Sequence, residues 1–330
     1  MFNKIIVIDP MEIVEESKNK LNNLAKEVIF FDTLAETDEE KIQRIGDAEA
    51  VLVSYRGSIG GAVIKACTNL KYIGMCCTLY SAESANVDII TAKKMGIEVL
   101  GISHYGDNGV IEFIVGGLIR LIHGFGSHQW REEPYELDGL NIGVIGMGNT
   151  GYNAAKALNY FGANISYYDR VEKEFCKNDG FELRSLYHVL KDSDVIITCL
   201  NRNTKVLFEE EFKIMGSGKI LINTSISPTY DIDALEKWLS DKSNYYICDS
   251  DMALGDENGK LIKLDNVICS HKASGGSHQE KFRFAEKIIE NIEKFFNDYE
   301  NLRSDLEHYL SKEGKNLMHS YDDEVNINEL

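Results

Sequence analysis

The sequence predicts an α/β protein of two doubly wound domains, each built around a parallel β-sheet. Short β-branched runs alternate with amphipathic stretches over the first hundred residues, and a second alternating set begins at Asn141. Such alternation is typical of βαβ units in a parallel sheet. The length of 330 residues exceeds what one hydrophobic core usually organises, which also favours two domains.

Residue patterns place the expected elements in both sets. In the first set, strands are expected at 4–9, 27–32, 50–55, 71–76 and 97–102, with helical stretches at 11–27, 38–48 and 87–96. In the second set, strands are expected at 141–146, 164–169, 194–200, 219–224, 245–250 and 266–271. A longer helix is expected from about Gly109 to His123, with further helices near Asp231 and from about Gln279.

The charge balance argues against several classes of protein. Acidic residues outnumber basic residues, 53 to 35, and the net charge of -18 argues against general binding of nucleic acid or of an anionic membrane. The most apolar stretch, Val110 to Ile122, contains Glu112 and Arg120 and is too short to span a bilayer. Seven cysteines without a CxxC pair indicate reduced thiols, so we expect a cytoplasmic protein without a signal peptide.

A glycine-rich turn carries the strongest motif. The segment NIGVIGMGNTGYNAAKALNYFG contains GxGxxG as Gly146, Gly148 and Gly151, directly after an expected strand and at the start of a helix. The first glycine permits the tight bend, the second lets the backbone approach a pyrophosphate, and the third lets helix and strand pack closely. Phosphates would bind free N–H groups at the helix N-terminus, beside Asn149 and Thr150. The pattern predicts a Rossmann domain that binds a dinucleotide.

An acidic residue ends the next expected strand. NISYYD ends at Asp169, 18 residues after Gly151. Its carboxylate would accept hydrogen bonds from the ribose hydroxyls and repel a 2′-phosphate, which favours NAD over NADP. Arg170 follows directly and weakens this preference. We therefore expect NAD as the cofactor, with NADP less favoured.

Further motifs resemble those of the D-isomer-specific 2-hydroxyacid dehydrogenase family, over about Lys71 to Ala285. The segments that carry the resemblance are ANVD (85–88), GVIEF (109–113), ELDGLNIGVIGMGNTG (136–151), LKDSDVIITCL (190–200), LINTSIS (221–227), ICDSD (247–251) and NVICSHKASGGS (266–277). Together these segments are more specific than any single motif.

The resemblance implies both an architecture and a set of contacts. It implies a flavodoxin-like substrate domain of residues 1–104 with about 286–330, an NAD-binding Rossmann domain of residues 105–285, and an active site in the cleft between them. It also implies a homodimer formed through the cofactor domain, and a small-molecule substrate. Beyond the glycine turn, the implied cofactor contacts are Cys199, Leu200, Asn201, Thr224, Ser225, Asp249 and His271.

Catalysis in this family, as the resemblance implies it, uses a histidine, a glutamate that tunes it, and an arginine that grips the substrate carboxylate. The histidine position is His271, which ends an expected strand. It is the candidate acid and base, because an imidazole side chain can both give and take a proton in the physiological pH range. The glutamate position falls on Leu254. A small shift of the alignment would supply Asp251, Asp256 or Glu257, although DENGK also fits a polar turn.

The arginine position falls on Ile226, and no Arg or Lys occurs between Ile220 and Glu236. Loss of a guanidinium from a closed site removes charge-assisted hydrogen bonds of roughly 1.5–3 kcal/mol each, so a standard 2-hydroxy acid is expected to react poorly. The candidate replacements are Arg202, Lys272 and Arg56, and each of them also fits a solvated surface residue. Ser225 and Ser227 offer hydrogen bonds to a neutral polar substrate.

The thiols and the missing catalytic residues leave alternatives open. Cys199, Cys248 and Cys269 lie near the ends of three expected strands. They could form a shared thiol or metal site, or they could be small buried hydrophobic residues, as free cysteines usually are. No metal is predicted. The leading hypothesis is an NAD-dependent oxidoreductase with altered substrate recognition. The alternatives are an NAD(H)-binding regulatory protein that has lost catalysis, and an enzyme that retains its cofactor through an oxidation and re-reduction of one substrate.

Overall fold

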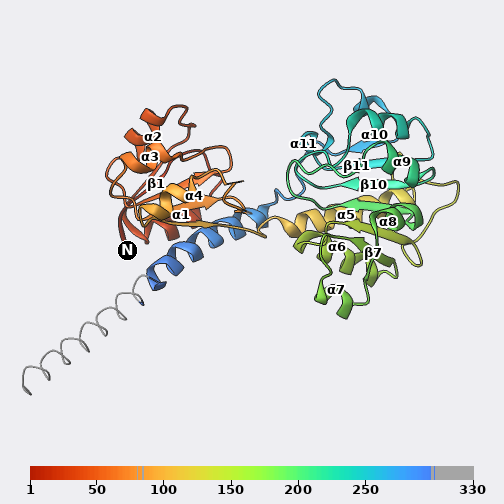
Figure 1. Cartoon of the computed structure of the whole chain (residues 1–330), viewed down its shortest axis with the longest axis horizontal. Helices are drawn as coiled ribbons and strands as arrows, with labels where there is room; N and C mark the ends of the chain where they lie inside the picture. Colours follow the sequence, from red (N-terminus) through yellow and green to blue (C-terminus); the bar gives the residue numbers. More distant parts are fainter. Residues whose placement is uncertain (80, 84, 299–300, 302–330) are drawn as a thin grey trace, which may run out of the picture. The chain divides into compact units, whose positions relative to one another are not determined.

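The computed structural model of the chain describes residues 1–79, 81–83, 85–298 and 301 (Figure 1). The chain divides into two units, one of Met1–Ser103 with the chain from Lys281 onward, and one of His104–Glu280. Each unit is built around its own parallel sheet, which confirms the predicted fold class. The assignment of a substrate role to 1–104 with 286–330, and of a cofactor role to 105–285, stays a prediction.

Five parallel strands form the sheet of the first unit. The strands are β1 (Phe2–Val7), β2 (Ala25–Phe30), β3 (Ala50–Ser54), β4 (Tyr72–Cys76) and β5 (Glu98–Gly101), and the helices are α1 (Glu15–Asn22), α2 (Asp38–Ile45), α3 (Gly61–Ala66) and α4 (Ile89–Lys94). The strand order is β2-β1-β3-β4-β5, as in flavodoxin-like doubly wound sheets. The carboxyl ends of β1 and β3 therefore flank the topological switch point of this sheet.

One helix is shorter than its sequence pattern indicates. The pattern predicts a helix over 11–27, but α1 ends at Asn22 and Ala25 already belongs to β2. Ala25 is buried and pairs with Phe2 of β1, so strand pairing and burial override the helical propensity of the segment. The sequence analysis does not predict α3, because its six residues show too little periodicity.

The last described segment is helical and packs on the first sheet. Residues 278–298 form a helix, in agreement with the helix predicted from about Gln279. Phe295 and Phe296 pack against Phe2, with ring centroids 5.3 and 4.6 Å from that of Phe2. The polar tail predicted after Glu300 lies outside the described residues, apart from residue 301.

Seven parallel strands form the sheet of the second unit. They are β6 (Asn141–Ile145), β7 (Asn164–Tyr168), β8 (Glu182–Leu183), β9 (Val195–Thr198), β10 (Ile220–Asn223), β11 (Tyr245–Cys248) and β12 (Val267–Cys269). Their order, β12-β11-β10-β9-β6-β7-β8, contains the Rossmann order, with β6 and β9 flanking the topological switch point. The sequence analysis predicts all of these strands except the two-residue β8.

Helices cover both faces of the second sheet. They are α5 (Asp107–Ile122), α6 (Asn149–Tyr160), α7 (Glu174–Asn178), α8 (Leu186–Asp192), α9 (Glu209–Met215), α10 (Ile232–Leu239) and α11 (Asp251–Leu254), with one 3-10 turn (Leu261–Lys263). The long helix predicted from about Gly109 is α5, and the helix predicted near Asp231 is α10. Among the described residues, no helix is both long enough and apolar enough to cross a lipid bilayer.

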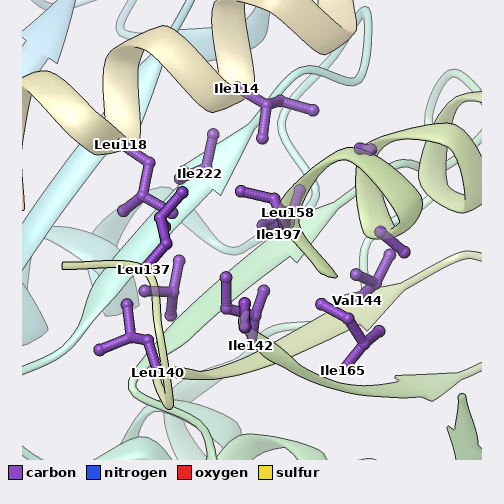
Figure 2. Packing of buried hydrophobic residues seen from close by; sticks show 14 of the residues in the cluster. Ile114, Leu118, Leu137, Leu140, Ile142, Val144, Leu158, Ile165, Ile197 and Ile222 are labelled. Carbon is purple, nitrogen blue, oxygen red and sulfur yellow. The ribbon is translucent and has the colours of Figure 1, made fainter. Parts of the chain in front are cut away.

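Alternate residues of the central strands fill two hydrophobic clusters. Ile197 and Ile222 pack with Ile114 and Leu118 of α5 in one cluster (Figure 2). Their neighbour Ile196 belongs to the other cluster, with helices α8, α9 and α10. Because successive side chains of a strand point to opposite faces, a continuous apolar strand is buried on both sides. This double burial fixes the register of the strand ends, where the candidate site lies.

A buried acid lies at the switch point of the first sheet. Asp9 follows β1 and is 1% exposed. Its Oδ1 accepts a hydrogen bond of 2.9 Å from the backbone N–H of Ser54, whereas its Oδ2 has no hydrogen-bond partner within the described part of the chain. Burial raises the pKa of Asp9, because the hydrogen bonds from Ser54 only partly offset the loss of water around the charge.

We expect Asp9→Asn to change the pH dependence of stability. Because the folded-state pKa of Asp9 is raised, the ionised carboxylate lowers stability as pH rises through that pKa, and the neutral amide avoids this loss. Urea unfolding of both proteins between about pH 4 and about pH 8 measures the effect. The stability of the variant relative to wild type should increase with pH, and a constant or falling difference would contradict a raised pKa.

Candidate active site

The glycine turn between β6 and α6 has the geometry of a phosphate cradle. A Cβ added to Gly146, whose φ is +94, would lie 2.4 Å from the carbonyl oxygen of Cys199, and one added to Gly151 would lie 2.1 Å from that of Gly146. A Cβ on Gly148 would meet no atom within 4 Å. Packing therefore requires the first and third glycines, while the second faces open space. This space suits the backbone approach of a dinucleotide pyrophosphate.

Helix α6 presents its first turn to the same space. Gly148 is its N-cap and provides no side-chain cap, so the N-terminal N–H groups are available to an anion. The side chains of Asn149 and Thr150 donate to the carboxylate of Asp107, with 2.9 Å from Thr150 Oγ1 to Asp107 Oδ1, and His104 Nδ1 lies 2.9 Å from the other oxygen. Sequence reasoning misses Asp107; its place as the first residue of α5 is the available signal.

The acid at the end of β7 supports the glycine turn. The Oδ2 of Asp169 accepts a hydrogen bond of 2.9 Å from the N–H of Met147, and its Oδ1 accepts one of 2.6 Å from the N–H of Arg170. Lys173 Nζ lies 3.9 Å from the carboxylate. Asp169 is thus held beside the turn, and the side chain of Arg170 is exposed next to it.

Two serines after β10 hold the loop that follows β9. Ser225 Oγ accepts from the N–H of Leu200 at 2.9 Å, and Ser227 Oγ accepts from the N–H of Asn203 at 2.7 Å. Between them, the side chain of Ile226 is 53% exposed. The chain thus builds the loop through serine hydroxyls and leaves an apolar side chain where the resemblance implies an arginine.

The thiol at the start of this loop is held in its protonated form. Cys199 Sγ lies 3.9 Å from Thr224 Oγ1, and burial raises the pKa of Cys199 to about 12. Cys199 packs against the cluster that contains α5, whereas Cys248 and Cys269 belong to the cluster on the opposite face of the sheet. The possible site shared by the three thiols is therefore not formed, because β10 and the sheet itself separate Cys199 from the other two.

His271 contacts one of the three acidic residues among which the sequence does not decide. Its Nδ1 lies 2.7 Å from Oδ1 of Asp251. Asp251 opens α11, where Ser250 caps the helix by accepting from the N–H of Ala253. Leu254, the residue at the implied glutamate position, is 2% exposed and packs in the core. The helix begins three residues earlier than that position, so the acid comes from its first turn.

The other two acidic candidates do not contact His271 in this way. Asp256 accepts hydrogen bonds from the N–H groups of Lys260 and Ile262, at 2.9 and 3.0 Å, and so organises the polar turn. Glu257 is exposed on this turn. Among the three acids, Asp251 is therefore the one placed to orient the imidazole. The Ser-Asp pair that closely follows β11 is a helix-start signal, and this signal identifies Asp251 in the sequence.

Asp249 fixes the loop that carries His271. Its Oδ2 accepts hydrogen bonds of 2.8 Å from both the N–H and the Oγ of Ser274, and its carbonyl oxygen accepts from the N–H of Lys272 at 2.8 Å. His271 itself has a left-handed backbone, with φ of 55. The Asp249 carboxylate is thereby engaged within the loop, which gives this residue a structural task in addition to the implied cofactor contact.

The three candidate cations differ in position. Lys272 and Arg202 are exposed on loops at the strand ends of the second unit. Arg56 belongs to the first unit, where its guanidinium lies 5.3 Å from the centroid of the Tyr55 ring and its Nε donates to the Tyr55 hydroxyl. None of the three is fixed in a buried ion pair, so each stays a candidate only.

Comparison with known proteins relates the chain to one family. Residues 117–273 match the model of the "D-isomer specific 2-hydroxyacid dehydrogenase, NAD binding domain". A hydroxypyruvate reductase from Blautia hydrogenotrophica is 28% identical over 293 residues, which cover 82% of this chain and 89% of that protein. The chain belongs to the D-isomer-specific 2-hydroxyacid dehydrogenase family. It is accordingly an oxidoreductase with an NAD-binding domain of the Rossmann type.

Two further comparisons extend the likeness, one in sequence and one in fold. A 2-hydroxyacid dehydrogenase homolog from Zymomonas mobilis is 31% identical over 221 residues, which cover 62% of this chain and 66% of that protein. Among solved structures, an acyclic imino acid reductase in complex with NADPH and D-Arg has a TM-score of 0.73 at 23% sequence identity. The superposition covers 89% of this chain and 97% of the reductase chain. The latter likeness establishes a shared fold.

We expect Gly148→Ala to fold normally and to bind dinucleotide poorly. Gly148 has φ of -78 and ψ of -167, which alanine adopts, and the added Cβ would meet only the open space of the cradle. NADH binding, followed by fluorescence, should weaken at least about tenfold, equivalent to about 1.4 kcal/mol. As a control, Gly116→Ala places a methyl group in open space on α5 and should leave binding unchanged. Unchanged affinity in Gly148→Ala would contradict the cradle.

Proposed function

We propose that the chain is an NAD-dependent oxidoreductase with altered substrate recognition and that His271 is its acid and base. The transfer takes place at a hydroxyl-bearing or carbonyl carbon, or at an imine carbon. The contact between His271 and Asp251 is the observation that carries this proposal. When bound, the nicotinamide donates or accepts the hydride. The residues of the chain bind the dinucleotide, orient the imidazole and move the proton.

The carboxylate of Asp251 suits the task of orienting His271. In a neutral imidazole, an Nδ1–H donated to Asp251 leaves Nε2 as the proton acceptor. After protonation, the same carboxylate faces the imidazolium and stabilises its charge. Asp251 would thus perform, from the first turn of α11, the task that the resemblance assigns to a glutamate at position 254.

This chain differs in substrate recognition from the pattern that the resemblance implies. The exposed Ile226 provides no charge for a substrate carboxylate. We propose Lys272 and Arg202 as candidate replacements, since both lie on loops beside the strand ends of the second unit. Arg56 remains a candidate from the first unit. A preference for neutral carbonyl compounds over 2-oxo acids would indicate that none of them replaces the arginine.

A substrate panel tests the proposed activity. NADH oxidation by the purified chain is measured over 2-oxo acids, aldehydes and imines, and at least one compound should be reduced. His271→Gln should lower kcat at least about a hundredfold, since a positioned acid and base typically contributes this much or more. Absence of turnover by dinucleotide-saturated protein with any compound of the panel would contradict the proposal.

Two substitutions test whether Asp251 acts by orienting His271 or only through its negative charge. They are Asp251→Asn and the control Glu257→Gln. Asp251→Asn should lower kcat roughly tenfold to a hundredfold with little change in KM, because the imidazole loses its partner but the substrate contacts remain. Glu257→Gln removes an exposed acid six positions further along and should leave kcat unchanged. Equal effects of the two substitutions would show that Asp251 has no specific role.

We further propose that NAD is preferred to NADP, as the position of Asp169 beside the glycine turn supports. Replacing Asp169 with Ser should raise kcat/KM with NADPH relative to NADH, because the charge that repels a 2′-phosphate is lost. Steady-state kinetics with both cofactors measures this ratio, and Asp179→Asn, at an acid that pairs with Tyr152, serves as the control. An unchanged ratio would assign the cofactor preference to another residue.

The location and assembly remain proposals that rest on the resemblance and the sequence. We propose a cytoplasmic homodimer whose interface involves His104–Glu280, the unit that contains the Rossmann sheet. Sedimentation of the intact chain as a monomer at micromolar concentration would contradict the dimer.

A second candidate function is a regulatory protein that binds NAD(H) without catalysis. The exposed Ile226 favours it, because the site provides no fixed cation at that position. The two candidates make opposite predictions for the substrate panel. Turnover that is abolished in His271→Gln rules out the regulatory protein, and dinucleotide binding without turnover supports it.

A further inference from the structure

Three potential metal ligands of different chemistry meet at the ends of β11 and β12. The Sγ of Cys269 lies 3.8 Å from Nδ1 of His271, and that nitrogen lies 2.7 Å from Oδ1 of Asp251. One ligand atom from each residue lies within 4.8 Å of the other two. Sequence analysis predicts no metal, because it pairs Cys269 with the other cysteines rather than with an acid from α11.

The backbone holds these three residues in place without any ion. Cys269 is fixed by the pairing of β12 with β11, in which it lies opposite Cys248. Both chain neighbours of His271 are anchored to the end of β11. The N–H of Ser270 donates to the carbonyl oxygen of Cys248, and the N–H of Lys272 donates to that of Asp249. Asp251 is fixed as the first residue of a capped helix. The backbone positions of the three ligands are therefore fixed by ladder, loop and capping hydrogen bonds that binding of a metal would not break.

We propose that Cys269, His271 and Asp251 form a site for Zn²⁺ that controls the acid and base. A thiolate, an imidazole nitrogen and a carboxylate oxygen are ligands that Zn²⁺ accepts, whereas Mg²⁺ and Ca²⁺ prefer oxygen alone. Bond lengths of about 2.3 Å to sulfur and about 2.0 Å to nitrogen place two tetrahedral ligands roughly 3.5 Å apart, close to the separation of Sγ from Nδ1. The Asp251 side chain is 74% exposed and so can turn to admit the ion.

Binding would change the protons of the site in a defined way. The Cys269 thiol releases its proton to the buffer when the thiolate coordinates. A neutral His271 coordinates through Nδ1 as the tautomer that carries its proton on Nε2, so the imidazole releases a proton only if it starts as the imidazolium. Three protein ligands leave a fourth position for water, which permits exchange of the ion. With Nδ1 coordinated, His271 no longer pairs with Asp251 and cannot cycle between imidazole and imidazolium. Zn²⁺ would therefore inhibit turnover reversibly, a consequence that rests on the proposed role of His271.

The binding part is tested without any measurement of activity. Full-length protein freed of metal with a chelator is titrated with Co²⁺, followed by absorbance, and with Zn²⁺, followed by calorimetry. We expect one equivalent per chain and a thiolate-to-Co²⁺ charge-transfer band. Cys269→Ser should abolish the band and weaken Zn²⁺ binding at least about tenfold. Asp251→Asn should weaken binding as well, since it removes one ligand.

Two matched variants control for nonspecific binding. Cys77→Ser changes a half-buried cysteine of the first unit, and Glu257→Gln changes an exposed acid outside the cluster; both should retain the band and the affinity. The absence of a saturable Co²⁺ signal, or a signal that survives Cys269→Ser, would overturn the site.

The regulatory part is tested separately with the best substrate of the panel. Zn²⁺ should inhibit NADH oxidation, a chelator should restore it, and Cys269→Ser should resist inhibition. Binding without inhibition would overturn the regulation while the site stands. If no compound of the panel turns over, the proposed function fails but the Co²⁺ band still decides the site.

Discussion

The parallel register of the second sheet is the constraint on which the rest of the site depends. Cys248 lies opposite Asn223 on one side and Cys269 on the other, and Thr198 lies opposite Asn223 and Ile145. The sheet therefore places five carboxyl ends along one edge, those of β6, β9, β10, β11 and β12. Residues from distant parts of the sequence lie along this edge in fixed order only because ladder hydrogen bonds and burial on both faces forbid a shift of one residue.

The sequence predicts the elements of this edge well, and physical reasons explain why. Strands buried on both faces are continuous apolar runs, so 194–200 and 219–224 are recognisable without any structure. Contacts with neighbouring carbonyl oxygens require glycine at 146 and at 151, which makes the spacing of these two residues specific. At an edge strand, by contrast, pairing overrides the local pattern, since Ala25 joins β2 although its neighbours favour a helix.

The chemistry of the site is less predictable, because it depends on side-chain directions. A count along the chain assigns the acid position to Leu254, and the structure brings in Asp251 from the start of the same short helix. Likewise, the separation of Cys199 from Cys269 follows from which face of the sheet each thiol occupies, a property that the three strand ends do not reveal. The spacing of motifs in the sequence predicts which strand ends carry the site, whereas side-chain packing decides which residues are in contact.

The left-handed backbone of His271 costs stability. A residue with a Cβ pays roughly 1–2 kcal/mol to adopt φ near +55, and glycine adopts it freely. Glycine at this position would therefore relieve the strain of the loop and remove the imidazole at the same time. The proposed acid and base thus occupies a position that the backbone alone would give to a residue without a side chain.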